Sequence, residues 1–174
     1  FQEEDFKWCF NRYNGFFVPV FDNNGYIQGL SIHLDKPFNN SEDIWFSSNG
    51  KINGTATKNY IMKSNITHNT TNVILTDSFI LGHLIKDTLN LPVISFQNIS
   101  NSYMILNEIQ NTNVRNITFI IRTPNCNNNL DYIINRIFRD LLPLGYNLDT
   151  KCVSNYKDIF NLDFFDNSLL VKTI

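Results

Sequence analysis

The stretch VILTDSFILGHLIKDTLNLPVISF, residues 73–96, decides the fold. Its short apolar run at 73–76 has the length and composition of a strand buried in a parallel sheet. Asp77 or Ser78 is suited to cap a helix after this run, because the apolar residues that follow recur at helical spacing. A second apolar run at 92–96 comes next. A strand, a helix and a strand in this order predict a parallel α/β unit with a right-handed crossover.

Toward the C-terminus the same alternation continues. A helix is predicted to start at Asn101 or Ser102 and is followed by a strand at 117–121. A long amphipathic helix then spans about 129–142, and a last strand covers 146–153. The fold class is therefore α/β, with a mostly parallel sheet of about four strands flanked by helices.

Toward the N-terminus the pattern indicates antiparallel β structure. The β-rich run 15–21, the turn signal Asp-Asn-Asn-Gly at 22–25 and the alternating run 26–34 together predict a hairpin. Short strands are also expected at 44–46 and 60–62. We therefore divide the chain into three parts: a β-rich lead-in at 1–69, the α/β domain at 70–155, and a closing helix or linker to a further domain at 156–174.

Composition narrows the class of protein. With 43% hydrophobic and only 17% charged residues the chain is expected to fold, and its net charge of -2 gives no broad attraction to nucleic acid. Asparagine recurs in runs, which fits turns, helix caps and an AT-rich coding sequence. Three scattered cysteines favour reduced thiols in a cytoplasm over a disulfide framework. The chain has no run of about 18 apolar residues and no signal peptide, so we expect a cytoplasmic protein without a membrane partner. It begins at Phe1, as an excised segment of a larger protein does.

The order of these pieces resembles the Toprim region of primases from bacteria and mobile elements, including a Toprim-like domain found in phages and integrative elements. The resemblance starts with GFFVPVFDNNGYIQG at 15–29, where primases have a similar G-x-x-x-P-h-x-D-x-x-G-x-h-x-G pattern. It continues through SIHLD at 31–35, WFSS at 45–48 and NGT at 53–55. The resemblance covers most of the chain and implies a Toprim-like (Rossmann-like) fold with a replication role.

The resemblance also shows what is missing. Toprim chemistry depends on a Glu after the first parallel strand and an Asp-x-Asp after the third, which together hold Mg²⁺. In this chain the Glu position falls on Asp77, and the acidic pair falls on Arg122 and Pro124. One carboxylate does not replace three, and a cation at Arg122 repels a metal ion. We therefore expect a domain that has lost the ordinary Toprim catalysis and requires no cofactor.

Three functions are compatible with this pattern. The leading hypothesis is a catalytically degenerate Toprim-like domain that binds nucleic acid, a nucleotide or another domain of its parent chain. The second is a divergent metal-dependent nuclease or primase domain that uses Asp77 with Asp131 or Asp158 and needs Mg²⁺. The third is a protein-interaction module that kept the fold and lost the site.

Candidate ligand contacts follow from residue type. Arg122 at a strand end is suited to hold a phosphate, or alternatively to form a salt bridge with Asp77. His33 is a further candidate for a phosphate contact. The alternative is that His33 is an ordinary packed or surface histidine. The last candidate is a basic, aromatic-lined groove for single-stranded nucleic acid. The alternative is a solvated loop with scattered lysines. The residues of the groove are Lys51, Lys58, Lys63, Trp45, Tyr60 and Arg122.

Overall fold

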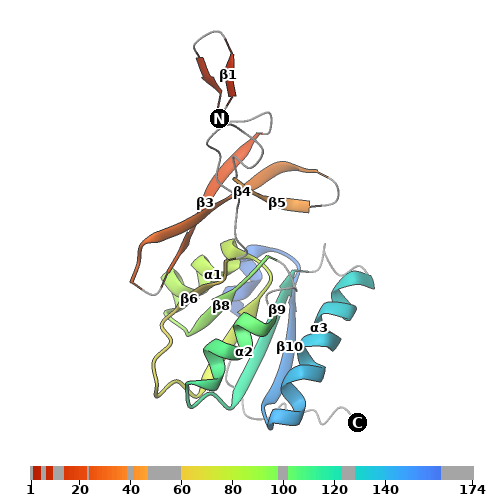
Figure 1. The fold of residues 1–174 in the computed structure, drawn as a ribbon. Coiled ribbons are helices and arrows are strands. Elements are labelled where there is room, and N and C mark those ends of the chain that lie inside the picture. The colour runs from red at the N-terminus through yellow and green to blue at the C-terminus, as the bar shows by residue number, and fades with distance from the viewer. Residues whose placement is uncertain are drawn as a thin grey trace. The chain divides into compact units, whose positions relative to one another are not determined.

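The computed structural model describes residues 2–4, 7–9, 14–22, 24–38, 41–46, 60–97, 102–122 and 128–161. The chain divides into two compact units, an N-terminal unit at Phe1–Tyr60 and a C-terminal unit at Ile61–Ile174. Figure 1 shows the elements of both. None of the helices in the described part of the chain is long and apolar enough to cross a membrane.

The N-terminal unit is built from antiparallel strands. Its main sheet has the order β3-β4-β5, and a separate pair, β1-β2, precedes it. The turn between β3 and β4 is held by Asp22, whose carboxylate accepts hydrogen bonds from the backbone N–H groups of Asn24 and Tyr26 at 2.8 and 2.9 Å. The hairpin predicted from the sequence is thus confirmed. The strands are β1 (Gln2–Glu4), β2 (Lys7–Cys9), β3 (Gly15–Phe21), β4 (Ile27–Phe38) and β5 (Ser41–Trp45).

The C-terminal unit contains a five-stranded sheet in the order β10-β9-β7-β8-β6. Strands β7, β8, β9 and β10 run parallel, and β6 pairs antiparallel with β8 at one edge. The mostly parallel α/β sheet expected from the alternation of strands and helices is therefore present. Its strands are β6 (Met62–Ser64), β7 (Asn72–Thr76), β8 (Val93–Ser95), β9 (Asn116–Arg122) and β10 (Asn147–Val153).

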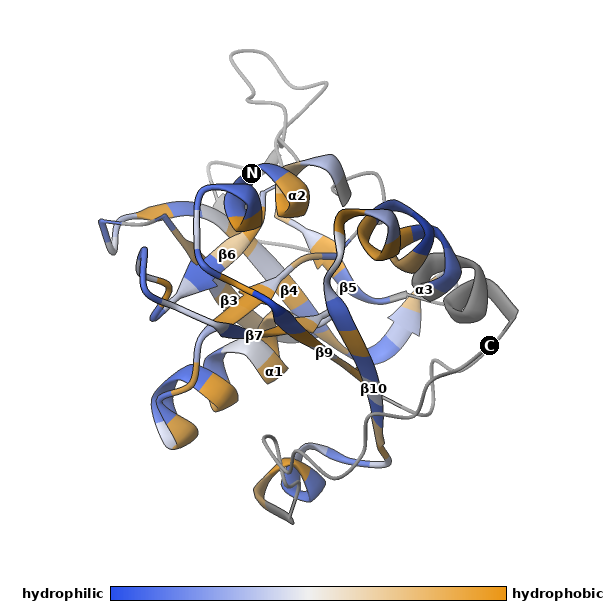
Figure 2. Cartoon of the chain, turned by 90° about the horizontal axis from the view of Figure 1, so that it is seen from below, coloured by the Kyte–Doolittle hydropathy of each residue, from blue (hydrophilic) through white to orange (hydrophobic). Residues whose placement is uncertain are grey.

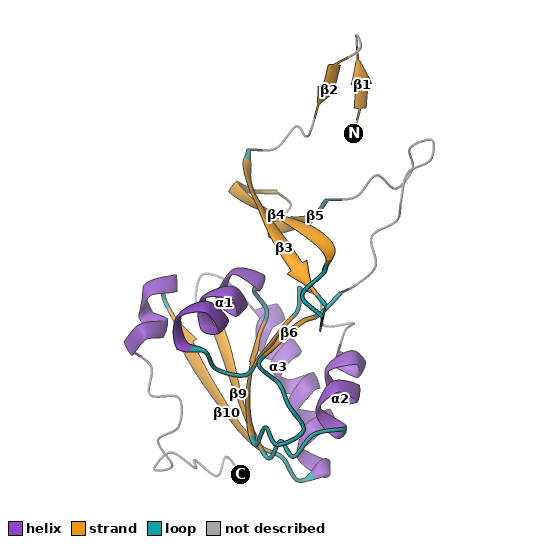
Figure 3. Cartoon of the chain, turned by 90° about the vertical axis from the view of Figure 1, so that its left-hand side faces the viewer, coloured by secondary structure: helices purple, strands orange, loops and turns teal. Residues whose placement is uncertain are grey.

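Helices cover both faces of this sheet (Figure 3). One buried cluster joins Val73 and Leu75 of β7 to residues of α2 and α3, whereas Ile74 packs in a second cluster with residues of α1, η1 and η5. Successive residues of β7 thus point to opposite faces, which explains why its sequence is apolar throughout. The helical elements are α1 (Phe79–Leu84), η1 (Ile85–Leu89), α2 (Ser102–Gln110), α3 (Asn128–Leu141), η4 (Leu142–Leu144) and η5 (Tyr156–Asn161).

Local sequence accounts for the helix boundaries. Ser78 caps α1, since its hydroxyl accepts a hydrogen bond from the backbone N–H of Leu81 at 3.3 Å. Figure 2 shows α3 with apolar residues along one side and polar residues along the other, and Ile137 and Leu141 on the apolar side are buried. Gly145, with a positive φ of 83°, ends the short η4 turn after α3.

The boundary between the units differs from the expected one at residue 69/70. It lies between Tyr60 and Ile61, because the strand expected at 60–62 is found at Met62–Ser64, as β6, and pairs with β8 of the parallel sheet. The part expected as a closing helix or linker begins with η5, and residues beyond 161 lie outside the described residues.

A row of asparagines crosses the amino end of the parallel sheet. Asn72, Asn116 and Asn147 are aligned in register on β7, β9 and β10. The Asn116 amide donates to Oδ1 of Asn72 at 2.6 Å, and the Asn147 amide donates to Oδ1 of Asn116 at 2.8 Å. Each side chain thus links neighbouring strands, so this ladder favours the observed register of the three strands over a shifted one.

Replacing the central Asn116 with alanine removes both side-chain hydrogen bonds of this ladder. We expect the free energy of unfolding to fall by about 1–3 kcal/mol, at roughly 0.5–1.5 kcal/mol for each of the two bonds. The measurement is urea unfolding followed by circular dichroism. The matched control is Asn113→Ala, at an exposed asparagine before β9, and equal losses in the two variants would contradict a stabilising ladder.

Candidate functional site

The carboxyl edge of the parallel sheet is the candidate site. Strands β7 and β9 are neighbours, with Thr76 paired to Ile120, so the strand ends next to Asp77 and Arg122 lie at the same edge of the sheet. The chain leaves β7 toward β8 on one side, by way of α1, and leaves β9 toward β10 on the other, by way of α3. The two helices lie on opposite faces. This reversal is a topological switch point, and open α/β sheets bind ligands outside the carboxyl ends of strands at such a point.

Asp77 lies at this edge, directly after β7 and before the cap of α1. It is half-buried. The backbone N–H of the next residue, Ser78, contacts the hydroxyl of Thr76 at 3.4 Å, and the side chains of both hydroxyl residues are buried. Ser78 caps the helix, so the Asp77 carboxylate follows the strand without serving as the helix cap.

Arg122 is the last residue of β9, and it pairs in register with Val153 of β10. The backbone therefore places both Asp77 and Arg122 at the carboxyl edge, at the ends of neighbouring strands. The Arg122 side chain lies outside the described residues, as does Pro124. A salt bridge between Asp77 and Arg122 stays a prediction.

The acidic residues of the metal-dependent alternative have other surroundings. Both oxygens of the Asp158 carboxylate accept hydrogen bonds in the turn after β10, from the N–H of Ser154 at 2.7 Å and from the N–H and side-chain amide of Asn155 at 2.9 Å. Asp158 thus shapes the start of η5. The Asp131 side chain on α3 lies outside the described residues. In the described ranges, no group of three or more His, Cys, Asp or Glu side chains is placed to hold a metal ion.

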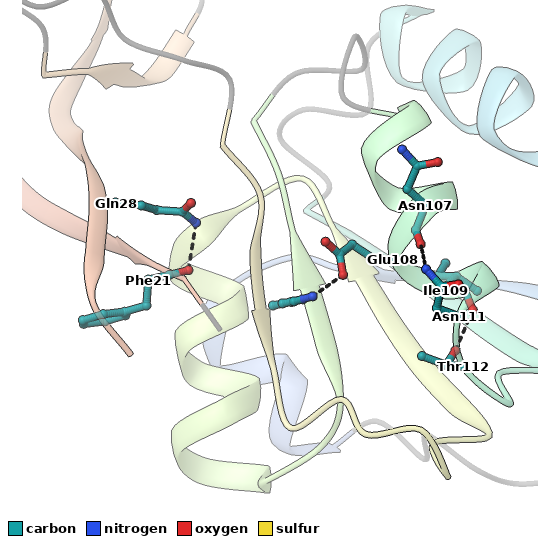
Figure 4. Close-up of polar contacts among 8 residues, drawn as sticks. Phe21, Gln28, Asn107, Glu108, Ile109, Asn111 and Thr112 are labelled. Carbon is teal, nitrogen blue, oxygen red and sulfur yellow. Dashed lines mark hydrogen bonds and ion pairs between the residues drawn. The ribbon is translucent and has the colours of Figure 1, made fainter. Parts of the chain in front are cut away.

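Lys63 has a partner within the C-terminal unit. Its ammonium forms an ion pair with the Glu108 carboxylate, which links β6 to α2 (Figure 4). The same helix ends just beyond Glu108, where the Thr112 hydroxyl donates to the carbonyl of Ile109 at 2.6 Å. A role for Lys63 in ligand binding would require this partly buried pair to open. The amino-acid sequence carries no signal that Glu108 is the partner of Lys63, because residues 63 and 108 meet only through the tertiary fold.

The other members of the proposed groove are divided between the units. Trp45 and Tyr60 belong to the N-terminal unit and pack edge to face, with ring centroids 5.9 Å apart. Lys63 and Arg122 belong to the C-terminal unit. Lys51 and Lys58 lie outside the described residues. The groove therefore stays a sequence prediction, and Trp45 has a packing role next to Gly29, where an added Cβ would come within 3.1 Å of its ring.

His33 is paired with an acid that the sequence did not single out. Its Nδ1 lies 2.9 Å from Oδ1 of Asp43 on β5, and its ring centroid is 5.1 Å from that of Phe16 on β3. Burial raises the pKa of the Asp43 carboxyl, because lost hydration outweighs the opposing hydrogen bond and charge at His33. A carboxylate beside the imidazole disfavours an incoming phosphate. This geometry suits a cross-strand contact that joins the three strands.

The two residues placed best for function are thus Asp77 and Arg122, which the backbone brings to the switch point. The His33–Asp43 pair in the N-terminal unit has the geometry of a structural contact. No family model, no curated protein and no solved structure matches this chain, so its function is proposed from its own residues.

Proposed function

We propose that the C-terminal unit is a degenerate Toprim-like domain that binds a phosphate-bearing ligand, a nucleotide or single-stranded nucleic acid, at the carboxyl edge between β7 and β9. The observation that carries the proposal is the parallel pairing of β7 and β9 at a topological switch point, with Asp77 following one strand and Arg122 ending the other. The unit is proposed to act as one domain of a larger replication protein.

The residue types at this edge favour binding without phosphoryl transfer. An arginine is permanently charged, and its planar guanidinium donates paired hydrogen bonds to phosphate oxygens. Metal-dependent Toprim chemistry needs several carboxylates, whereas only Asp77 occupies a family position here. The negative charge of the ligand is then neutralised by the Arg122 guanidinium in place of a divalent ion.

The test compares two arginines at opposite ends of β9. Arg122 ends β9 at the carboxyl edge, and exposed Arg115 precedes the amino end of β9. Binding of a fluorescent single-stranded oligonucleotide is measured for the wild type, Arg122→Ala and Arg115→Ala at low and moderate salt. Arg122→Ala is expected to weaken binding about tenfold, since a hydrogen bond to a charged group contributes about 1.5 kcal/mol, and to lower the salt slope by about one phosphate contact.

Further arms of the experiment separate the alternatives. Competition by a mononucleotide distinguishes a nucleotide pocket from a strand-binding surface. Binding that is equal in EDTA and in Mg²⁺ supports recognition by side chains alone, whereas binding that needs Mg²⁺ and is lost in Asp77→Ala supports the metal-dependent alternative. If the two arginine substitutions weakened oligonucleotide binding equally, or if neither changed it, the carboxyl edge would be rejected as the site.

A further inference from the structure

The outer edge of β10 is a second feature with functional consequences. β10 ends the five-stranded sheet, and no strand in the described part of the chain pairs with its outer side. The strand spans seven residues, all of them paired on the inner side with β9. An edge of this length presents a row of backbone donors and acceptors that favours pairing with another strand.

Alternation along β10 defines which backbone groups face outward. The N–H of Asn147 donates to the carbonyl of Arg115, so residue 147 faces the β9 side. Successive residues of a strand direct their N–H and C=O groups to opposite sides. Those of Leu148, Thr150 and Cys152 therefore point to the outer edge. Thr150 lies at the centre of these three.

We propose that two copies of this chain pair through their β10 strands, antiparallel about a two-fold axis at Thr150. In this register Thr150 meets its own copy, and Leu148 meets Cys152 of the second copy. These three residues direct their backbone groups outward. Each of them therefore lies opposite a residue of the second copy with which it can exchange backbone hydrogen bonds. Asp149 then lies opposite Lys151 of the second copy, and the reciprocal pair forms by symmetry.

Charge complementarity supports this register. Within one chain Asp149 and Lys151 lie on the same face of β10, with 3.9 Å between the carboxylate oxygen and the ammonium. Residues opposite each other without backbone hydrogen bonds have the closest side chains in an antiparallel pair. The proposed dimer places both Asp149–Lys151 pairs at such positions, which creates a cluster of two acids and two bases around the axis.

The same residues have a different role in the single chain. The backbone N–H of Thr150 donates to Oδ1 of Asp149 at 2.8 Å, so the central outward donor is satisfied locally. Pairing replaces this bond by one to the carbonyl of Thr150 in the second copy and releases the carboxylate toward Lys151. Charged side chains on an edge strand also serve to prevent pairing, and the experiment must separate these two roles.

A second copy fits the edge better than a parallel strand from the same chain. Ile159 of η5 packs in the buried cluster that contains Leu81 and Ile85, so η5 lies on the face that carries α1. The crossover from β9 to β10 uses the opposite face, where α3 packs. A parallel strand added beyond β10 by way of η5 would therefore need a left-handed crossover, which is rare.

The first test is a charge swap measured by sedimentation velocity over a range of concentrations. The wild-type chain is expected to dimerise. Asp149→Lys and Lys151→Asp each place like charges opposite each other and are expected to raise the dissociation constant about tenfold or more. The double variant Asp149→Lys/Lys151→Asp restores opposite pairs, so it is expected to recover most of the dimer. Circular dichroism of each variant checks that its fold is retained.

The second test is a disulfide at the two-fold axis. Opposed residues of a hydrogen-bonded antiparallel pair have Cα atoms about 5.5 Å apart, within the range of about 4.4–6.8 Å that a disulfide spans. Thr150→Cys is therefore expected to give a covalent dimer under mild oxidation, and Gln110→Cys, at an exposed residue of α2, is the control. Both variants are made after the native cysteines have been changed to serine: Cys9, Cys126 and Cys152.

A monomer at every concentration would overturn the proposal and assign Asp149 and Lys151 to protection of the edge. A dissociation constant that is unchanged by both single charge reversals would overturn this interface. So would a yield of covalent dimer that is no higher for Thr150→Cys than for Gln110→Cys. Recovery in the double swap together with linkage at Thr150 would support both the partner and the register. None of these outcomes depends on phosphate binding at the carboxyl edge.

Discussion

Phe119→Ala is expected to lower the free energy of unfolding of the C-terminal unit by about 3–5 kcal/mol, the range for deleting a large buried side chain. Phe119 is 0% exposed on β9, and its ring centroid lies 5.9 Å from that of Phe96, which follows β8. Because β7 lies between these two strands, the two rings meet across Leu75 beneath the helices α2 and α3. Alanine leaves a cavity there that the packed strands do not readily close.

The measurement is urea unfolding followed by circular dichroism, with Phe160→Ala as the control in the same unit. Phe160 is 50% exposed, so its removal is expected to cost about 1 kcal/mol or less. Phe119→Leu retains much of the volume and is expected to fall between the two. If Phe119→Ala proved no more harmful than Phe160→Ala, the described core would be misplaced.

Local sequence was sufficient for most elements of the C-terminal unit. The run at 73–76 is apolar on both faces and is followed by a capping serine, so strand and helix are specified within a few residues of each other. The position of Tyr60 and the residues after it was harder to predict. A short apolar run there is equally suited to either sheet, and only its pairing with β8 assigns it to the parallel one.

The candidate site was partly predictable for a related reason. Asp77 and Arg122 were proposed by matching a family pattern, and the pairing of β7 with β9 depends on sheet topology, which local propensity does not specify. The partners of His33 and Lys63 were missed, because Asp43 and Glu108 meet them through sheet register and helix packing. The asparagine ladder was missed too, since composition alone ascribes asparagines to turns, whereas strand register aligns three of them.

Gly82→Ala is expected to destabilise the C-terminal unit by about 2 kcal/mol, within the range for overpacking a core. In an open helix this change would be favourable, since alanine is preferred over glycine by about 1 kcal/mol. Gly82 is buried on α1, however, and an added Cβ would lie 1.8 Å from the Ser95 hydroxyl oxygen and 2.7 Å from the Met62 methyl group. The clash outweighs the helical preference. Urea unfolding of the variant measures the net effect.

A double-mutant cycle with Ser95→Ala identifies the cause. The Ser95 hydroxyl is fully buried and has no hydrogen-bond partner among the described residues, so Ser95→Ala alone is expected to be neutral or slightly stabilising. In the double variant the nearest atom to the new methyl group is gone, and we expect recovery of about 1 kcal/mol relative to additivity. Additive effects would show that α1 shifts away from β8 instead. Because Ser78 caps this helix and Asp77 directly precedes the cap, such a shift would also move the carboxyl edge at which ligand binding is proposed.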